Sequence, residues 1–230
     1  MLTTMPPTRA EPVVAEETPL RIAGTAVVLR DGLDGPETLL LRRPQSGSFP
    51  GAWVFPGGRV DPADGLGAVT ELNAARNAAL RETQEEAGIR IHDLAVLSCW
   101  TPPPETPVRF RTWFFLAREQ GEEVRANPGE IEEAAWLTAE RVFARHALGE
   151  IVLFPPTWVT LHGLLLHRSV DEAFAAMEAL AEPAQFATRM AADGDFVMWS
   201  GDEEYPDLPG GVGARHRLRM GPLPWAYERS

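Results

Sequence analysis

Three glutamates near the middle of the chain are the residues whose spacing most clearly suggests chemistry. Glu82, Glu85 and Glu86 lie at positions i, i+3 and i+4, so a helix would place all three carboxylates on one face. Like charges at this spacing cost helix stability, and the negative end of the helix dipole adds to that cost. A sequence that accepts both costs is typical of a cation-binding site.

The expected cation is Mg²⁺ or Mn²⁺, because a segment with carboxylate oxygens and no cysteine or histidine favours these ions over zinc. Arg81 lies four residues before Glu85 and can orient that carboxylate. The single cysteine, Cys99, excludes internal disulfides and any site built from several cysteines. The alternative interpretation of the three glutamates is the solvated charged face of an ordinary helix.

A glycine pair before this segment favours the cation site over that alternative. Phe55-Pro56-Gly57-Gly58 lies at the end of a predicted strand. Two adjacent glycines allow a tight turn and a close approach of the backbone to a ligand. A strand, a Gly-Gly turn and a helix that ends in R-E-x-x-E-E-x-G form a composite pattern that chance explains poorly.

The elements that must position these residues can be read from hydrophobic periodicity. The helix with the glutamates is predicted over residues 74–87, where good helix formers dominate and Gly88 can cap the end. Apolar runs predict strands at 22–29, 38–41, 52–55, 91–100, 109–117, about 130–136 and 215–220. Further helices are expected at 138–147, with Thr138 as N-cap, at 156–168 and at 170–181.

The connections between these elements restrict the fold class. The early strands are joined by turns that are too short for crossovers, which excludes a doubly wound parallel sheet. Strands before and after one central helix instead predict a mixed α/β or α+β sandwich. The apolar stretch 151–166 is interrupted by Pro155 and Pro156 and is too short to span a membrane.

The charge balance limits the partners of the chain. Its 230 residues include 33 Asp and Glu against 21 Lys and Arg, giving a net charge of −12, and all 21 of the latter are arginines. The absence of lysine excludes Schiff-base chemistry. The acidic balance argues against binding to nucleic acid or to anionic membranes. An anionic small-molecule substrate would need recruited cations or arginines gathered in one place.

The segment from Gly58 to Ile89 resembles the signature of the Nudix hydrolases, which is a glycine, five residues, a glutamate, seven residues and then R-E-U-x-E-E-x-G-U, with U apolar. The chain departs from it in three ways. Asp64 stands in place of the first glutamate, sixteen residues instead of seven separate it from Arg81, and Thr83 fills an apolar position. Glu71 therefore competes with Asp64 for the early acidic position. The matching residues are Gly58, Arg81, Glu82, Glu85, Glu86, Gly88 and Ile89.

The resemblance implies hydrolysis of a diphosphate that links a nucleoside to another group. It implies Glu85 and Glu86 as the main metal ligands, and Glu82 as a ligand or general base. Arg81 is expected to support catalysis, and a carbonyl of Gly58 to complete the metal shell. Further carboxylates are expected from Asp64, Glu130 or Glu133, although ordinary surface charge explains the last two equally well. Candidates for phosphate recognition, which suits the guanidinium fork, are Arg42, Arg43, Arg59, Arg109 and Arg111.

Two further stretches, 100–117 and 150–157, resemble the peroxisomal coenzyme A diphosphatase branch of the family. This branch implies cleavage of coenzyme A or acyl-CoA to 3′,5′-ADP and phosphopantetheine products. The alternative within the enzyme class is an ADP-ribose, dinucleotide or nucleotide-sugar diphosphatase. The alternative of another class is a non-catalytic Nudix-fold module that binds a ligand.

Composition, together with the resemblance, predicts how the chain is organised. Residues 1–19 are expected to form a disordered tail without a signal peptide, and 20–150 a Nudix α/β/α sandwich with a mixed central sheet. Residues 151–230 are expected to be a mainly helical extension packed on that core. We also expect a cytoplasmic location, no membrane or nucleic-acid partner and, as a possibility, a homodimer.

Overall fold

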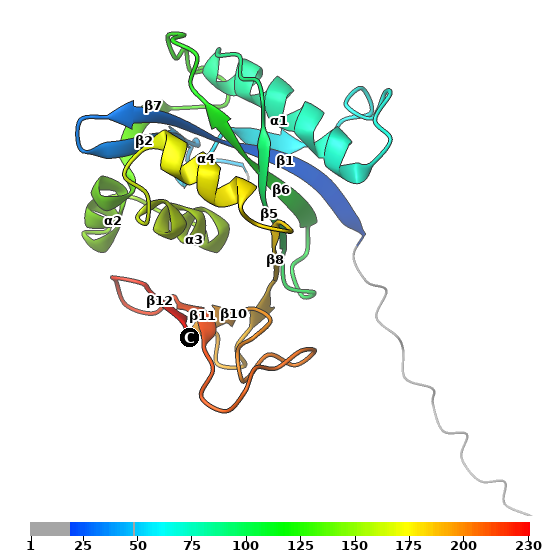
Figure 1. The fold of residues 1–230 in the computed structure, drawn as a ribbon, viewed down its shortest axis with the longest axis vertical. Helices are drawn as coiled ribbons and strands as arrows, with labels where there is room; N and C mark the ends of the chain where they lie inside the picture. The colour runs from blue at the N-terminus through cyan, green and yellow to red at the C-terminus, as the bar shows by residue number, and fades with distance from the viewer. Residues whose placement is uncertain (1–18, 48) are drawn as a thin grey trace, which may run out of the picture.

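A mixed sheet of eight strands organises the chain in the computed structural model, which describes residues 19–47 and 49–230 (Figure 1). The strand order is β3-β2-β1-β6-β5-β8, while β4 pairs with β1 and β7 with β2. The strands of this sheet are β1 (Leu20–Gly32), β2 (Gly35–Arg42), β3 (Trp53–Val54), β4 (Gly57–Arg59), β5 (Ala95–Thr101), β6 (Arg109–Arg118), β7 (Glu133–Thr138) and β8 (Ala184–Ala187).

A second, smaller sheet and four helices complete the part of the chain that the structure describes. The helices are α1 (Glu71–Ala87), α2 (Ala139–Ala147), α3 (Pro155–Leu164) and α4 (Val170–Glu178). The small sheet has the order β12-β11-β10-β9, formed by β9 (Arg189–Met190), β10 (Phe196–Met198), β11 (His216–Arg219) and β12 (Ala226–Arg229). None of the helices in residues 19–47 and 49–230 has the length and apolar composition needed to span a bilayer.

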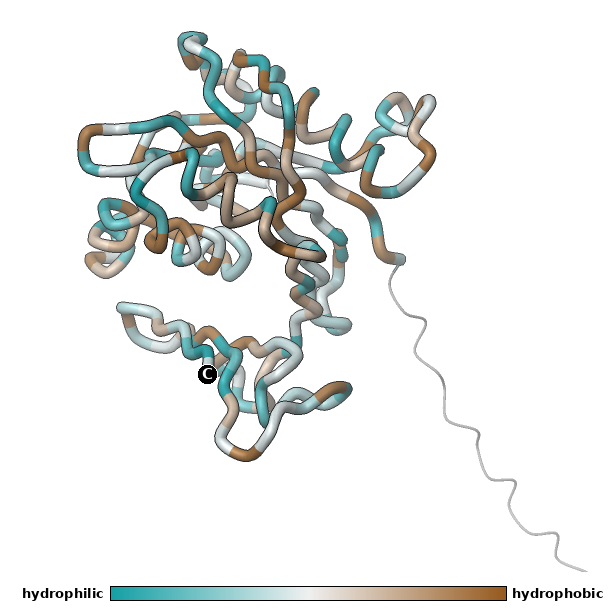
Figure 2. Tube along the Cα trace, in the orientation of Figure 1, coloured by the Kyte–Doolittle hydropathy of each residue, from teal (hydrophilic) through white to brown (hydrophobic). Residues whose placement is uncertain are grey.

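Strand β1 is the centre of the large sheet. It runs parallel to β6 along its length, and its other edge pairs antiparallel first with β4 and then with β2. The central strands are mostly hydrophobic (Figure 2), as expected for strands covered on both faces. One face packs against α1 through alanines and the other against α2, α3, α4 and the C-terminal strands. This arrangement confirms the predicted sandwich with a mixed central sheet.

Helix α1 lies unusually close to β1. A Cβ atom placed on Gly24 would come within 1.8 Å of the carbonyl oxygen of Ala75, so only glycine fits there. The helix is also three residues longer at its start than predicted. Thr70 caps it, since its hydroxyl accepts a hydrogen bond from the N–H of Asn73, and the acidic Glu71 suits the first turn.

The C-terminal extension differs from the sequence prediction. We expected residues 151–230 to be mainly helical, but helices end at Glu178 and five short strands follow. Strand β8 joins the edge of the large sheet beside β5, and Trp100 stacks on Phe186 with ring centroids 3.8 Å apart. The tail predicted at 1–19 lies almost wholly outside the described residues. The domain boundaries, the homodimer and the cytoplasmic location stay predictions.

Candidate active site

The C-terminal end of α1 carries the three glutamates, and two features fix its position. Gly88 adopts a left-handed conformation (φ 71°) and its N–H bonds to the carbonyl of Gln84, which confirms the predicted C-cap. The next loop then folds back, so that the N–H groups of Arg125 and Asn127 donate to the carbonyls of Ala87 and Glu86. This contact satisfies two carbonyls of the helix end and brings the segment that contains Glu130 toward the glutamates.

Glu86 is the most buried of the three glutamates, with 3% of its surface exposed. Its Oε2 accepts a hydrogen bond from the N–H of Gly57 at 3.0 Å, and its Oε1 lies 3.3 Å from Nη1 of Arg43. Burial raises the pKa of Glu86 to about 7, helped by the negative charges of Glu82 and Glu130, against the opposing effect of Gly57 and Arg43. The protein therefore places the carboxyl group of Glu86 at a position where its ionised form is disfavoured relative to water.

Glu82 faces the glycine pair from the neighbouring turn of α1. A Cβ atom on Gly58 would lie 2.3 Å from Oε1 of Glu82, so glycine is what lets the β4 backbone approach this carboxylate. Burial raises the pKa of Glu82, and the charges of Glu85 and Glu130 raise it further. The backbone of Gly58 and the carboxylate of Glu82 thus share one small space.

Arg81 links the remaining carboxylates. Its Nη1 lies 3.0 Å from Oε1 of Glu82 and donates to Oε2 of Glu85 at 2.8 Å, while Nε and Nη2 bond to the two oxygens of Asp64 at 3.1 and 2.9 Å. Nη2 also donates to the carbonyl oxygen of Arg59 at 3.1 Å. Glu85 is half exposed, so Arg81 orients a carboxylate that solvent can reach.

The structure brings Asp64, and not Glu71, to the three glutamates. Burial alone would raise the pKa of Asp64, but hydrogen bonds from Arg81 and from the N–H of Asp61 outweigh it and lower that pKa. Glu71 instead accepts hydrogen bonds from Nε1 of Trp113 and Nη1 of Arg111, at the opposite end of α1. The residues between Asp64 and Arg81 form a loop and the first turns of the helix, which leaves the carboxylate spacing unchanged.

Most of the other predicted residues pair away from the glutamates. Glu133 lies 3.3 Å from Arg42, which also pairs with Glu132. Glu130, by contrast, lies close enough to Glu82 and Glu86 for its negative charge to raise their pKa. Arg109 is buried, and its Nε has no hydrogen-bond partner among the described residues. A role in substrate binding stays a prediction for Arg42, Arg109 and Arg111.

Two contacts of the site were missed by sequence reasoning. Arg43 was predicted to bind substrate, but the structure pairs it with Glu86, and the hydrogen bond from Gly57 to Glu86 was not predicted at all. Both contacts join residues far apart in the chain, and the only local signal was the glycine pair itself.

A sequence profile of the NUDIX domain matches residues 20–155. The chain belongs to the Nudix family. It is a hydrolase that acts on pyrophosphate bonds. Its structure is similar to that of a NUDIX hydrolase from Alicyclobacillus acidocaldarius, with 28% sequence identity and a TM-score of 0.63 over 71% of this chain and 97% of the other.

A second similar structure is the NUDIX domain of Shewanella oneidensis NrtR complexed with ADP ribose. Its sequence identity to this Nudix hydrolase is 14% and the TM-score is 0.50, over 63% of this chain and 86% of the other. At this level of identity the similarity concerns the fold alone.

The side chains at the end of α1 fit a divalent cation, although no group of three potential ligands in residues 19–47 and 49–230 is already arranged around one point. Five carboxylates gather here with only two guanidinium groups, those of Arg43 and Arg81. All the donors are hard oxygens, which suit Mg²⁺ or Mn²⁺. We name this set the active-site cluster: Arg43, Asp64, Arg81, Glu82, Glu85, Glu86 and Glu130.

Proposed function

We propose that this protein is a metal-dependent Nudix hydrolase that cleaves the diphosphate bond of a nucleoside-linked substrate, and that this substrate is coenzyme A or acyl-CoA. The observation that carries the reaction is the surplus of buried and half-buried carboxylates beside the Gly57-Gly58 turn. The support for coenzyme A is the resemblance of the stretches 100–117 and 150–157 to that branch.

In this proposal the residues of the active-site cluster have different roles. Glu82, Glu85 and Glu86 would hold Mg²⁺ or Mn²⁺, with a carbonyl of Gly58 as a further ligand. When bound, the metal supplies charge neutralisation for the phosphates and lowers the pKa of a water molecule. Arg81 fixes Glu85 and Asp64, so that the carboxylates are oriented before the substrate arrives.

Glu82 is our candidate for the general base. Its raised pKa and its place against Gly58 suit a group that accepts a proton from the attacking water. The water oxygen forms a bond to one phosphorus, and the bond from this phosphorus to the bridging oxygen breaks. The leaving phosphate departs with that bridging oxygen and its electron pair.

A substrate panel tests this proposal. Purified protein with Mg²⁺ or Mn²⁺ is incubated with coenzyme A, acetyl-CoA, ADP-ribose, a dinucleoside polyphosphate and a nucleotide sugar, and the products are identified by mass spectrometry. We expect 3′,5′-ADP and phosphopantetheine products from the coenzyme A substrates. If ADP-ribose is hydrolysed while coenzyme A and acetyl-CoA stay intact, the reaction class survives and the coenzyme A assignment is wrong.

The variant Glu85→Gln tests catalysis itself. Because this side chain is half exposed, we expect the melting temperature to change little, while turnover falls by about 100-fold or more. Glu123→Gln is the matched control, since Glu123 is an exposed glutamate that also pairs with an arginine and lies outside the active-site cluster. Undiminished turnover in Glu85→Gln would refute the metal-site assignment.

A further inference from the structure

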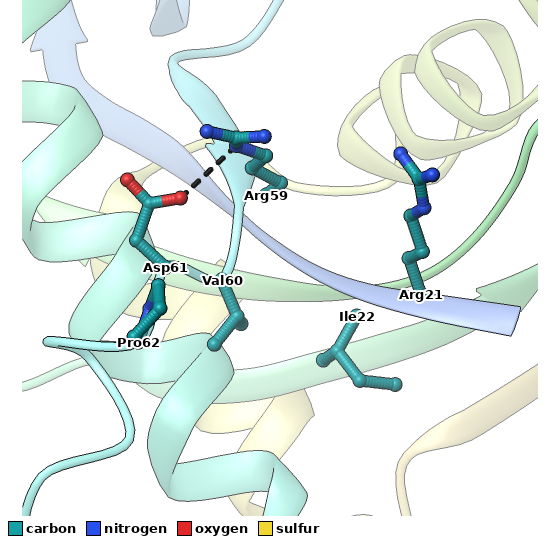
Figure 3. A pocket seen from close by; sticks show the side chains of 6 residues that line it. All are labelled: Arg21, Ile22, Arg59, Val60, Asp61 and Pro62. Atoms are coloured by element: carbon teal, nitrogen blue, oxygen red, sulfur yellow. Dashed lines mark ion pairs between the residues drawn. The ribbon is translucent and has the colours of Figure 1, made fainter.

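Two surface hollows in the described part of the chain differ in the residues that line them. In the first, of about 460 Å³, Arg59 already pairs with Asp61 at 3.0 Å (Figure 3). Its apolar side chains, Ile22 and Val60, pack into the cluster below α1. The second, of about 370 Å³, combines exposed apolar side chains with charged ones. We name it the hairpin hollow, and its lining includes Leu33, Asp34, Glu140, Leu164, Leu165 and Arg168.

Leu33 is an apolar projection at the rim of the hairpin hollow. Leu33 and Asp34 form the two-residue tip of the β1–β2 hairpin, between the paired residues Gly32 and Gly35. Such tips normally carry glycine or polar residues. Leu33 is instead fully exposed, and the β1–β2 turn is brown in Figure 2. A leucine in this position gains free energy when a second surface covers it.

The end of α3 forms the apolar part of the hairpin hollow. Leu164 is buried in the core, Leu165 is partly exposed, and Leu166, which follows it, is largely exposed. The hollow therefore places an apolar recess directly beside the apolar projection of Leu33.

Hydrogen bonds and an ion pair hold the projection and the recess in place. The carboxylate of Asp31, near the end of β1, accepts a hydrogen bond at 2.8 Å from the N–H of Val170, the first residue of α4. Arg30 and Glu37 pair across the hairpin at 2.7 Å. A surface fixed in this way loses little conformational freedom on binding.

Charges of both signs surround the leucines. Asp34 is next to Leu33 at the hairpin tip, Arg168 lines the recess, and Glu140 lies at the start of α2. All three are exposed, and none of them forms an ion pair within the described part of the chain. The surface thus offers a projection and a recess, and an acid and a base, so it is complementary to itself.

Self-complementarity favours a second copy of this chain as the occupant. In a two-fold symmetric contact each feature of one copy meets its counterpart on the other. The chain has a net charge of −12, so contacts between copies elsewhere tend to bring like charges together. At the hairpin hollow an arginine is available to meet the acid of the other copy.

We propose that the hairpin hollow is the interface of a two-fold symmetric dimer. Leu33 of each copy packs into the recess of the other, and Asp34 of each copy pairs with Arg168 of the other. This inference does not rest on the proposed function. The hairpin tip lies at the opposite end of β2 from Arg43, which contacts Glu86 of the active-site cluster.

Analytical ultracentrifugation over a concentration series tests the leucine contact. We expect the wild type to dimerise and Leu33→Glu to raise the dissociation constant of the dimer by about tenfold or more, because it places a carboxylate in an apolar recess. Val212→Glu is the matched control, since Val212 is also fully exposed but lies outside the hairpin hollow. This control should change the dissociation constant by less than about twofold.

A charge exchange tests the pairing of Asp34 with Arg168. Asp34→Arg and Arg168→Asp should each weaken the dimer by about tenfold, because each places like charges opposite one another. The double variant keeps the net charge of the wild type, and its dissociation constant should return to within about threefold of the wild-type value.

The proposal is wrong if the wild type stays monomeric at the highest concentration at which it is soluble. A dimer that Leu33→Glu leaves unchanged would place the interface elsewhere and also overturn it. A double variant as weak as the single variants would refute the pairing of Asp34 with Arg168. Because sedimentation needs no substrate, a failure of the proposed function leaves these outcomes unaffected.

Discussion

Two of the arginine–carboxylate clusters in the described part of this protein have different charge balances. The active-site cluster sets five carboxylates against two arginines. The second, which we name the Arg217 cluster (Asp202, Glu204 and Arg217), joins β11 to the loop before it. It pairs one buried arginine with a buried aspartate and an exposed glutamate. This difference in charge balance distinguishes a structural ion pair from a site whose negative charge is left for a bound cation to balance.

In the Arg217 cluster the charged groups satisfy each other. Nε of Arg217 donates to Asp202 at 2.7 Å, and the N–H groups of His216 and Glu204 donate to the same carboxylate at 2.9 and 3.0 Å. Burial alone would raise the pKa of Asp202, but these hydrogen bonds outweigh it and lower the pKa to about 2. The ring of Phe196 lies 4.2 Å from the guanidinium carbon.

In the active-site cluster the charged groups oppose each other. The pKa of Glu86 is raised to about 7, so its ionised form lacks the stabilisation that Asp202 receives. A buried charge with incomplete pairing costs stability, and functional sites are where proteins accept such costs. The comparison therefore predicts that neutralising Asp202 lowers the free energy of unfolding, whereas neutralising Glu86 does not lower it.

The largest effect is expected from Asp202→Asn, because it leaves the buried guanidinium of Arg217 without its partner. We expect the free energy of unfolding, measured in urea, to fall by about 3–5 kcal/mol. Glu86→Gln should leave this free energy unchanged or raise it, while abolishing most of the turnover. If Glu86→Gln destabilised the protein as much as Asp202→Asn, the contrast between the two clusters would be wrong.

The pH dependence of stability should have opposite signs in the two clusters. The folded pKa of Asp202, about 2, lies below its ordinary value of 3.8, so its contribution is present above pH 3.8 and lost as pH falls toward 2. The folded pKa of Glu86, about 7, lies above 4.5, so folding favours its protonated form and stability declines as pH rises from 4.5 through 7.

Unfolding in urea with EDTA at pH 5 and pH 8 measures the pH dependence of stability that Glu86 contributes. We expect Glu86→Gln to exceed the wild type at pH 8 by about 2 kcal/mol, with a much smaller difference at pH 5. Addition of Mg²⁺ should stabilise the wild type more than the variant. A difference between the two proteins that is the same at both pH values would contradict the raised pKa of Glu86.

Local sequence signals predicted the parts of the fold and of the site that depend on short-range geometry. The shared face of Glu82, Glu85 and Glu86 follows from helix periodicity, and the caps at Gly88 and Thr138 follow from residue type. These features need no knowledge of the rest of the fold.

The parts that sequence reasoning missed depend on long-range packing. The Arg217 cluster joins Arg217, on a strand that was predicted, to Asp202 at the start of a long Gly- and Pro-rich loop, and the composition of this loop gives no signal for that contact. The choice between Asp64 and Glu71 depends on how the loop before α1 folds, because both residues precede the helix that was predicted at 74–87 and neither has a local signal that favours it. Only the contact with Arg81 separates them.

The smallest effects are expected from neutralising these two acids, and they test that separation. Asp64→Asn should lower kcat/KM by about tenfold, because Arg81 loses a partner that orients it toward Glu85. Glu71→Gln should change kcat/KM by less than about twofold and stability by less than about 1 kcal/mol, since its pair with Arg111 is partly exposed. Initial rates over a Mg²⁺ titration measure both variants. A larger loss of kcat/KM in Glu71→Gln than in Asp64→Asn would assign the early acidic position to Glu71. The ion pair between Asp64 and Arg81 would then be structural, like that of the Arg217 cluster, and would not be part of the active-site cluster.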